Sequence, residues 1–308
     1  MTTPESASVP PRRVTPLEIP ALTASDRLRF PLTREQLSLR VKEALEEDGA
    51  FNDVTTMATV VSGRRARASL VARQAGTLAG VPFALETFRL LDAKISMRVD
   101  AEDGRRVEKG DTIIYITGHA RAMLSAERVA LNFMQRLSGI ATLTSKFVDA
   151  VRGTKARIFD TRKTTPGWRT LEKYAVRAGG GSNHRMDLST SVLIKDNHIA
   201  SVDGNIGFAV RRAREIAPAT AKIEVECVNA QQADLAATAG ADIVLLDNMP
   251  PDLLRECVRV VRGRAILEAS GGVNLQNVRT IAETGVDVIS VGALTHSAPA
   301  MNLAVDFE

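Results

Sequence analysis

The sequence predicts an α/β protein in two parts: an α+β domain with an antiparallel sheet, followed by a longer region of parallel βαβ units. Residues 64–118 form short runs of alternating apolar and polar residues, separated by Gly, Asp-Gly and Lys-Gly turns. After residue 150, apolar β-branched runs alternate with amphipathic helical stretches. The centres of the last four runs, near residues 225, 245, 267 and 289, recur every 20 to 22 residues, as successive βαβ units do.

The first residues predict an extension and then a helix. Residues 1–28 are rich in Pro, Ser and Thr and show little apolar periodicity, so we expect a flexible N-terminal extension. A helix should follow, because Leu37, Val41 and Leu45 recur at helical spacing and Gly49 closes the run.

Residues 29–145 are expected to form the α+β domain. Its last segment, SAERVALNFMQRLSGIATLTSKFVDAV, has a helical pattern. Ser125 is expected to cap this segment, and Gly139 is expected to break it into two helices.

Residues 146–295 contain six apolar runs of the kind that form parallel strands buried on both faces: KARIFD, SVLIKD, KIEVEC, ADIVLLD, RAILEAS and DVISVGA. Six strands are too few for a standard eight-stranded barrel but could form a smaller or incomplete one. An open doubly wound sheet is the alternative.

The composition is typical of a soluble protein with a sizeable core. Apolar residues make up 44% of the chain and the mean hydropathy is −0.03. No apolar run reaches the roughly 18 residues that span a membrane, and we see no secretory signal in the sequence. Cys227 and Cys257 fit neither a metal-ligand spacing nor a disulfide framework, so we expect buried thiols in a reducing cytoplasm.

The positive charge is concentrated in one region. Residues 157–198 hold eight Lys and Arg against four Asp and Glu, which accounts for the net charge of +4. A focused excess suits a small anionic ligand better than a nucleic acid, and the 4% aromatic content disfavours stacking platforms for bases.

Two acidic residues end successive predicted strands, where parallel α/β folds place their chemistry. Glu226 and Asp247 could each cap the following helix, but together with Lys195 one strand earlier they favour coordination of Mg²⁺ or of sugar hydroxyls. Glu224 would lie on the same side of its strand as Glu226. The sequence favours Glu226 only because it is nearer the strand end.

Small residues end the last two predicted strands. Ser270, Gly271 and Gly272 follow one, and Val291, Gly292 and Ala293 follow the other. Such turns let backbone N–H groups approach a phosphate, and barrels place phosphate sites at this point of the chain. His296 follows closely and is either a ligand contact or a surface residue.

Cations on the expected rim are the strongest physical signal for a ligand. Arg162, Lys163, Arg185 and Lys195 fall in or beside loops, and His184 adjoins Arg185. The three glycines of GGGSNHR predict a loop able to fold over a site. Because Arg matches carboxylates and phosphates in shape, we expect a ligand with several negative groups. No Cys or His spacing supports a zinc site.

These segments resemble one family, the quinolinate phosphoribosyltransferases. The resemblance covers roughly residues 32–308 and rests on EDGAFNDVTT, SAERVALNFMQRLSGIAT, FDTRKTTPGWRTLEKYAVRAGGGSNHRMDLSTSVLIKDNHI, IEVEC, VLLDN, LEASGGV and ISVGALTHS. It implies an incomplete α/β barrel of about six strands over residues 146–295, beside an N-terminal α+β sandwich-like domain. Residues 296–308 are expected to return to that domain.

The resemblance also implies a reaction and an assembly. Quinolinate and phosphoribosyl pyrophosphate would give nicotinate mononucleotide, pyrophosphate and CO₂ with Mg²⁺ as cofactor, in de novo NAD synthesis. The protein would be a cytoplasmic homodimer or larger homo-oligomer. No nucleic acid or membrane would be involved.

By motif match, each predicted site residue takes a role. Lys163, Glu226 and Asp247 would be catalytic, with Lys163 at the boundary between quinolinate and pyrophosphate. Glu226 and Asp247 would hold the ribose hydroxyls and Mg²⁺, directly or through water. The quinolinate cradle would comprise Arg162, Arg185, Lys195, nearby His184, and Arg128 from a partner subunit.

The remaining predicted contacts position the loop and the phosphate. Thr161 would steady the turn that carries Arg162. The two small-residue turns, Ser270–Gly272 and Val291–Ala293, would bind the 5′-phosphate through backbone donors.

Three other functions fit parts of the sequence. A paralogous phosphoribosyltransferase could use the same motifs on another base. Lys195 at a strand end could form a Schiff base in an aldolase-like barrel. A non-catalytic anion-binding protein would bind quinolinate without turnover.

Overall fold

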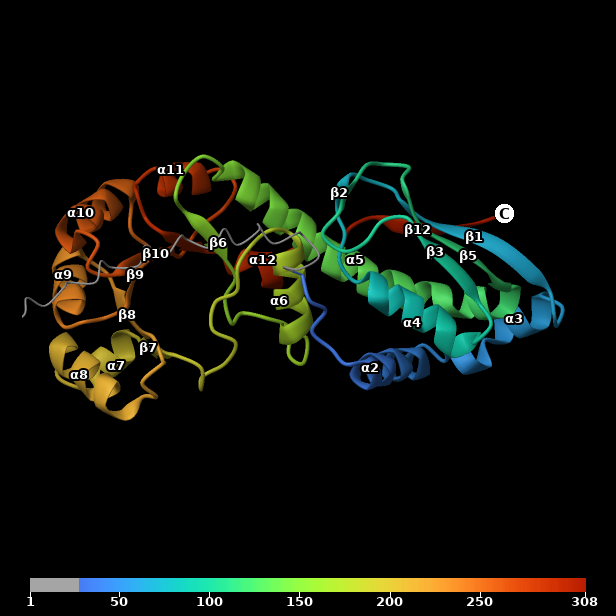
Figure 1. The fold of residues 1–308 in the computed structure, drawn as a ribbon, viewed down its shortest axis with the longest axis horizontal. Coiled ribbons are helices and arrows are strands. Elements are labelled where there is room, and N and C mark those ends of the chain that lie inside the picture. The colour runs from blue at the N-terminus through green and yellow to red at the C-terminus, as the bar shows by residue number, and fades with distance from the viewer. Residues whose placement is uncertain (1–27) are drawn as a thin grey trace, which may run out of the picture.

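The computed structural model describes residues 28–308, so the predicted N-terminal extension lies outside the described residues apart from Leu28. Figure 1 shows two units at opposite ends of an elongated molecule, a sheet with helices and a barrel, and the long helix α5 runs between them. Within residues 28–308, no helix is both long and apolar enough to cross a membrane.

The N-terminal unit begins with α2 (Arg34–Glu47), where the sequence predicts a helix. Thr33 caps it reciprocally with Gln36, and Val41 and Leu45 are buried. The chain leaves the helix at Gly49, whose φ of 66° few other residues adopt readily. Short helices η1 (Ala50–Asn52) and α3 (Val54–Thr59) follow.

A four-stranded antiparallel sheet forms the other layer of this unit, in the order β12-β1-β5-β3. Its strands are β1 (Arg65–Ala72), β3 (Ser96–Val99), β5 (Thr112–His119) and β12 (Leu303–Phe307). The C-terminal segment thus pairs with β1, with Ala68 opposite Phe307. A separate ribbon joins β2 (Gly76–Thr77) and β4 (Arg106–Val107). Helices α4 (Val81–Leu91) and α5 pack on the sheet through Phe88 and Met134.

The expectation of two helices broken at Gly139 is wrong. Helix α5 (Ala120–Ala150) is continuous, and it begins after His119 rather than at Ser125. Gly139 serves close packing instead, because a Cβ there would lie 2.1 Å from the carbonyl oxygen of Pro299. The predicted domain boundary at residues 145–146 therefore falls inside this helix.

The six predicted parallel strands are all present and form one sheet, in the order β6-β11-β10-β9-β8-β7. Their bounds are β6 (Arg157–Phe159), β7 (Val192–Ile194), β8 (Ile223–Cys227), β9 (Ile243–Asp247), β10 (Ile266–Ser270) and β11 (Val288–Ser290). Strands β6 and β7 follow each other in the chain but occupy the two edges. The sheet therefore curves into a barrel left open between them, as an open doubly wound sheet does not.

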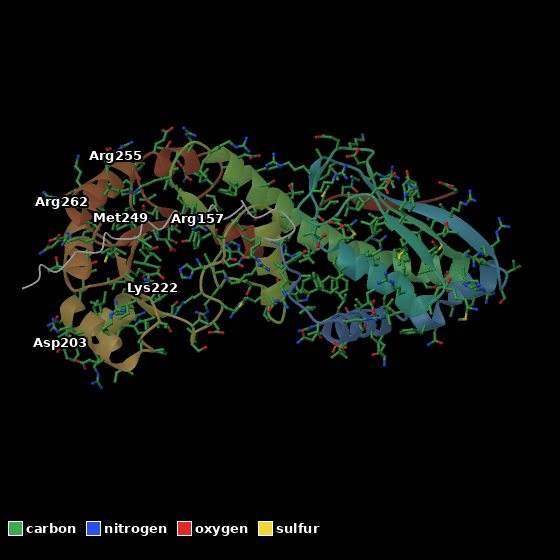
Figure 2. The ribbon with its side chains drawn as sticks, viewed as in Figure 1. Arg157, Asp203, Lys222, Met249, Arg255 and Arg262 are labelled. Carbon is green, nitrogen blue, oxygen red and sulfur yellow. The ribbon has the colours of Figure 1, made fainter. Side chains whose placement is uncertain are left out.

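Helices cover the outside of this barrel. They are α6 (Arg169–Ala178), α7 (Asp196–Ala200), α8 (Ile206–Ile216), α9 (Ala230–Thr238), α10 (Pro251–Val261), α11 (Val278–Ala282) and α12 (Ala293–His296). In Figure 2, the labelled side chains of Arg255 and Arg262 lie on the outer side of the barrel, in and just after α10.

Alternate strand residues face the helices and the barrel interior. Val225 and Cys227 of β8 pack in the outer core with Cys257 of α10, while Glu224 and Glu226 point to the other side. Both cysteines are free and buried, as predicted. Burial raises the pKa of Cys227 to about 12 and that of Cys257 to about 11, so neither thiol is reactive at neutral pH.

Candidate active site

A buried ion pair anchors the loops at the end of β6. The Lys173 ammonium donates to the Asp160 carboxylate, and both side chains are at most 1% exposed. Asp160 also accepts from the backbone N–H of His184 at 2.8 Å and from Asn183 Nδ2 at 2.6 Å. This network holds the Ser182–Arg185 segment against the loop that follows β6.

The loop Asp160–Arg169 is held by a contact within itself and by contacts with Glu172 of α6. Thr161 Oγ1 accepts from the backbone N–H of Lys163 at 3.1 Å, the turn contact expected of Thr161. The buried carboxylate of Glu172 accepts from the Thr165 backbone at 3.0 Å, and Arg136 of α5 donates to the same carboxylate at 2.6 Å. The loop is therefore rigid on the side that faces α5.

Arg162 and Arg185 lie close enough to affect each other. Burial, and next the neighbouring Arg162 charge, lower the pKa of Arg185. Arg185 Nη1 donates to the carbonyl oxygen of Ser191 at 3.0 Å. Arg162 Nε is buried and has no hydrogen-bond partner among the described residues. Two adjacent guanidinium groups with an unused donor form a site for an anion.

Lys195 and Glu226 meet at the ends of β7 and β8. Lys195 Nζ lies 3.0 Å from Glu226 Oε2, and the Lys195 side chain is half exposed. On the next strand, Asp247 Oδ2 accepts from Asn248 Nδ2 at 3.0 Å. Glu226 and Asp247 each keep one oxygen for which the described residues supply no hydrogen-bond donor. Hard carboxylate oxygens on neighbouring strand ends fit Mg²⁺, which keeps several waters of its own.

The two small-residue turns differ in what they can offer a phosphate. Gly271 and Gly272 have φ of 89° and 61°, and within the described chain neither N–H has an acceptor. Gly292 lies against the Lys163 side chain, since a Cβ there would be 3.2 Å from Lys163 Cδ. The Val291 N–H is not available to a phosphate, because it donates to the Phe159 carbonyl at 2.9 Å. The expectation of a backbone donor at Val291 is thus wrong.

His296 is exposed and approaches the second turn. A Cβ on Gly292 would lie 3.2 Å from its Nε2 atom. Thr295 Oγ1 of the same turn donates to the Lys163 carbonyl at 2.7 Å. The β11 turn and the loop after β6 therefore come together around Lys163.

The interpretation of GGGSNHR as a loop able to fold over the site is wrong. A Cβ on Gly179 would lie 2.4 Å from the Ala141 carbonyl oxygen, and one on Gly181 would lie 2.8 Å from Thr144 Cγ2. These glycines allow the backbone to press against α5, so the loop is fixed at its base. His184 and Arg185 follow from this fixed base.

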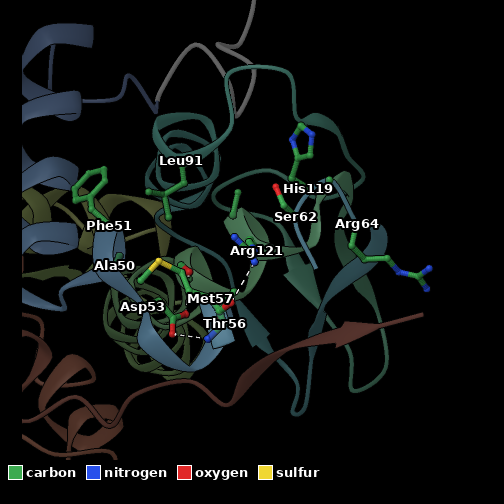
Figure 3. A pocket seen from close by; sticks show the side chains of 13 residues that line it. Ala50, Phe51, Asp53, Thr56, Met57, Ser62, Arg64, Leu91, His119 and Arg121 are labelled. Atoms are coloured by element: carbon green, nitrogen blue, oxygen red, sulfur yellow. Dashed lines mark hydrogen bonds between the residues drawn. The ribbon is translucent and has the colours of Figure 1, made fainter. Parts of the chain in front are cut away.

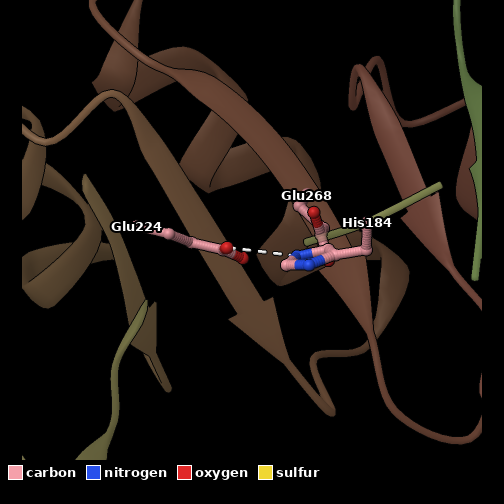
Figure 4. A group of neighbouring side chains, drawn as sticks. All are labelled: His184, Glu224 and Glu268. Carbon is pink, nitrogen blue, oxygen red and sulfur yellow. Dashed lines mark ion pairs between the residues drawn. The ribbon is translucent and has the colours of Figure 1, made fainter. Parts of the chain in front are cut away.

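His184 extends into the barrel interior between two buried glutamates (Figure 4). Its Nε2 lies 3.1 Å from Glu224 Oε2 and 3.6 Å from Glu268 Oε1. Its Nδ1 accepts from the backbone N–H of Arg185 at 2.8 Å. Although burial opposes it, Glu224 and Glu268 raise the pKa of His184. A second ring proton would displace the Arg185 bond, so the geometry favours the neutral ring with its proton on Nε2.

That proton position argues against a metal ion at His184, Glu224 and Glu268. A histidine that binds a metal through one nitrogen donates a hydrogen from the other. Here Nδ1 accepts a hydrogen bond, so Nε2 must carry the proton and cannot offer a lone pair. Burial and Glu224 raise the pKa of Glu268 to about 7, so a proton on Glu268 can offset part of the excess negative charge.

Sequence reasoning missed Glu268, and one signal could have found it. Glu268 interrupts the apolar run RAILEAS two residues before Ser270, as Glu224 precedes Glu226 in KIEVEC. Period-two spacing places all four on the interior side. Glu172 and Arg136 carried no such signal, because their contact joins two helices far apart in the chain.

A cavity of about 380 Å³ in the N-terminal unit is a separate feature (Figure 3). It lies between α3 and the start of α5, and its walls include Asp53, His119 and Arg121. Asp53 accepts from the Thr56 backbone, and Arg121 donates to carbonyls of α3 and its C-cap, so these groups are already satisfied. Arg128 is exposed farther along α5.

Comparisons with known proteins cover nearly all of the described chain. The family described as "Quinolinate phosphoribosyl transferase, N-terminal domain" matches residues 53–138, and its C-terminal counterpart matches residues 140–306. This junction also falls inside α5.

Named relatives agree with the family match. A Mycobacterium leprae protein, "Nicotinate-nucleotide pyrophosphorylase (carboxylating)", is 44% identical over 274 residues, covering 86% of this chain and 95% of the relative. A Bacillus subtilis protein called probable for the same activity is 42% identical, covering 88% and 93%. The solved nicotinate-nucleotide pyrophosphorylase of Francisella tularensis aligns with a TM-score of 0.84 and 38% identity, covering 90% and 98%.

Proposed function

Because the chain belongs to the quinolinate phosphoribosyltransferase family, we propose that this barrel site joins quinolinate to phosphoribosyl pyrophosphate and releases CO₂. The products are nicotinate mononucleotide and pyrophosphate, and the step belongs to NAD biosynthesis. The single observation that supports this site assignment best is the closeness of Arg162 and Arg185. The Nε atom of Arg162 is buried and has no hydrogen-bond partner in the described chain.

Quinolinate binding uses the charges at the ends of β6 and β7. The two neighbouring carboxylates of quinolinate would neutralise the positive charges of Arg162 and Arg185. Lys195 lies on the same rim and is held by Glu226. Planar guanidinium groups match carboxylates in shape, so they set the angle of the pyridine ring as well as its affinity.

Phosphoribosyl pyrophosphate binding uses the carboxyl ends of β8, β9, β10 and β11. The free N–H groups of Gly271, Gly272 and Gly292 suit its 5′-phosphate. Glu226 and Asp247 accept from the ribose hydroxyls. Lys163, packed against Gly292, faces the departing pyrophosphate. Mg²⁺ held by Glu226 and Asp247, directly or through water, would neutralise charge on the leaving group.

The reaction then needs orientation more than a reactive side chain. As the bond from ribose C1 to pyrophosphate breaks, positive charge develops on the ribose, and the nearby carboxylates stabilise it. The pyridine nitrogen attacks C1. The new pyridinium stabilises the electron pair left at C2 when CO₂ departs, and C2 takes up a proton. Holding both substrates in line supplies much of the rate.

The ion pair of Lys195 disfavours a Schiff-base mechanism. An amine that forms a Schiff base must be free to approach a carbonyl, whereas Lys195 Nζ is held 3.0 Å from Glu226 Oε2. We therefore expect no adduct after borohydride treatment with a sugar phosphate.

The assembly and compartment are part of the same proposal. We expect a homodimer or larger assembly in which exposed Arg128 of one subunit reaches the quinolinate site of another. The free, buried Cys227 and Cys257 suit a reducing cytoplasm.

The direct test is formation of nicotinate mononucleotide from quinolinate, phosphoribosyl pyrophosphate and Mg²⁺. Nicotinate serves as the control base, because it lacks the 2-carboxylate. Equal turnover of nicotinate would indicate a paralogous specificity, and quinolinate binding without turnover would indicate an anion-binding protein.

A further inference from the structure

The buried layer beneath the substrate rim has no role in the function proposed above. Glu224 and Glu268 lie two residues before Glu226 and Ser270 on their strands, so they sit one layer deeper in the barrel. Both are 2% exposed, and each has one oxygen without a hydrogen-bond partner among the described residues. His184, part of the quinolinate cradle, reaches both of them, as Figure 4 shows.

The His184 ring connects this layer to the backbone of the cradle. Glu224 accepts from Nε2 at 3.1 Å, and Nδ1 accepts from the Arg185 N–H at 2.8 Å. Removing the Glu224 acceptor would leave the buried ring free to turn, and turning would break the Arg185 bond. Asp160 accepts from the N–H of His184 and from Asn183 Nδ2, and Lys173 Nζ donates to the His184 carbonyl at 3.0 Å, so the ring supplies the contact to the Arg185 N–H itself.

We propose that Glu224 is a positioning residue for quinolinate recognition, which acts through the His184 ring to fix the backbone that carries Arg185. The proposal rests on the proposed function, since it assumes that Arg185 binds a quinolinate carboxylate. Glu224 touches neither substrate nor the reacting atoms. We expect its effect mainly on quinolinate, because the glycines that suit the phosphate follow other strands, β10 and β11.

The buried pair of Glu224 and Glu268 destabilises the fold. A measurement of stability can therefore distinguish a positioning role of Glu224 from a structural one. Two buried carboxylates repel each other, and burying a carboxylate costs free energy, whereas burying an apolar side chain of similar size is favourable. Replacing either glutamate with an uncharged residue should therefore leave the barrel at least as stable. A loss of quinolinate affinity in a protein of unchanged stability points to positioning.

The experiment compares Glu224→Leu, Glu224→Gln and Glu268→Gln by calorimetry with each substrate. Glu224→Leu should raise the quinolinate Kd about tenfold, equivalent to about 1.4 kcal/mol, and change the phosphoribosyl pyrophosphate Kd less than about twofold. Glu224→Gln keeps an oxygen for Nε2–H, and its amide can donate to Glu268, so its quinolinate Kd should stay within about threefold of wild type. Glu268→Gln is the matched control and should bind quinolinate as wild type does.

Unchanged quinolinate affinity in Glu224→Leu would overturn the proposal, as would equal loss for both substrates or equal losses in Glu224→Leu and Glu224→Gln. A readout without activity comes from ¹H–¹⁵N spectra of the four histidines. His184 should carry its proton on Nε2 in wild type, and a proton on Nδ1 would overturn the proposal even if Glu224→Leu does not fold. Failure of wild type to bind quinolinate would instead reject the proposed function.

Discussion

Replacing either glycine of the turn after β10 with Ala should destabilise the protein, and the loss should be larger at Gly271 than at Gly272. Gly271 and Gly272 both have positive φ, so either Ala substitution costs about 1–2 kcal/mol of folding free energy. A Cβ on Gly271 would lie 2.3 Å from Asn248 Oδ1, whereas one on Gly272 has only that atom nearby, at 3.9 Å. Gly271→Ala must therefore displace the Asn248 side chain.

That displacement sets the magnitude. Asn248 Nδ2 donates to Asp247 Oδ2 at 3.0 Å in an exposed position, where competition with water limits a hydrogen bond to about 0.5–1.5 kcal/mol. We expect Gly271→Ala to lose about 1.5–3.5 kcal/mol in total and Gly272→Ala about 1–2 kcal/mol. Because Asp247 loses its orienting partner, Gly271→Ala should also raise the KM for phosphoribosyl pyrophosphate.

Urea unfolding of both variants measures the difference, provided that the slope m stays constant. Equal losses in the two variants would refute the reasoning, because the positive φ alone would then account for both. A full loss in Gly271→Ala with an unchanged KM would show that Asn248 does not orient Asp247 toward the substrate.

Three further changes test the site. Arg162→Ala should weaken quinolinate binding far more than phosphoribosyl pyrophosphate binding, and equal loss of both in calorimetry would contradict the assignment. Lys173→Met should cost about 3–5 kcal/mol in urea unfolding, because it leaves the buried Asp160 charge without its cation; a loss below about 1 kcal/mol would contradict this. Glu268 has its pKa raised from 4.5 to about 7, so the folded state binds its proton more tightly and this contribution to stability is lost as pH rises from about 4.5 to 7. Glu268→Gln should therefore have a free energy of unfolding up to about 3 kcal/mol above that of wild type at pH 8. At pH 4.5 the two proteins should be nearly equally stable. A difference that stays constant across pH would exclude Glu268 as the titrating group.

Local patterns were sufficient for the strands and for most of the rim. Six apolar β-branched runs predicted six parallel strands, because a strand buried on both faces must be apolar along its length. The polar residues that end those strands were equally visible, and the parallel arrangement brings such ends to one edge. The resemblance to a known family supplied the reaction, which spacing alone did not.

Close packing between distant segments was not visible in the sequence. Gly139 and Gly179 had the appearance of a helix break and a mobile loop, yet each is glycine because another backbone lies within 2.4 Å of where its Cβ would be. A single sequence does not show what approaches a residue from elsewhere in the chain.

The sequence by itself determined which residues lie on the rim, because period-two alternation and strand ends are local properties of Glu226, Asp247 and Lys195. Only the tertiary structure decided what each rim residue can do. It used the Val291 N–H within the sheet, left Arg162 Nε without a partner among residues 28–308, and placed His184 against Glu224. Hydrogen bonds and repulsion between charges depend on distances across the fold, and these distances are set only when the strands assemble around the buried layer.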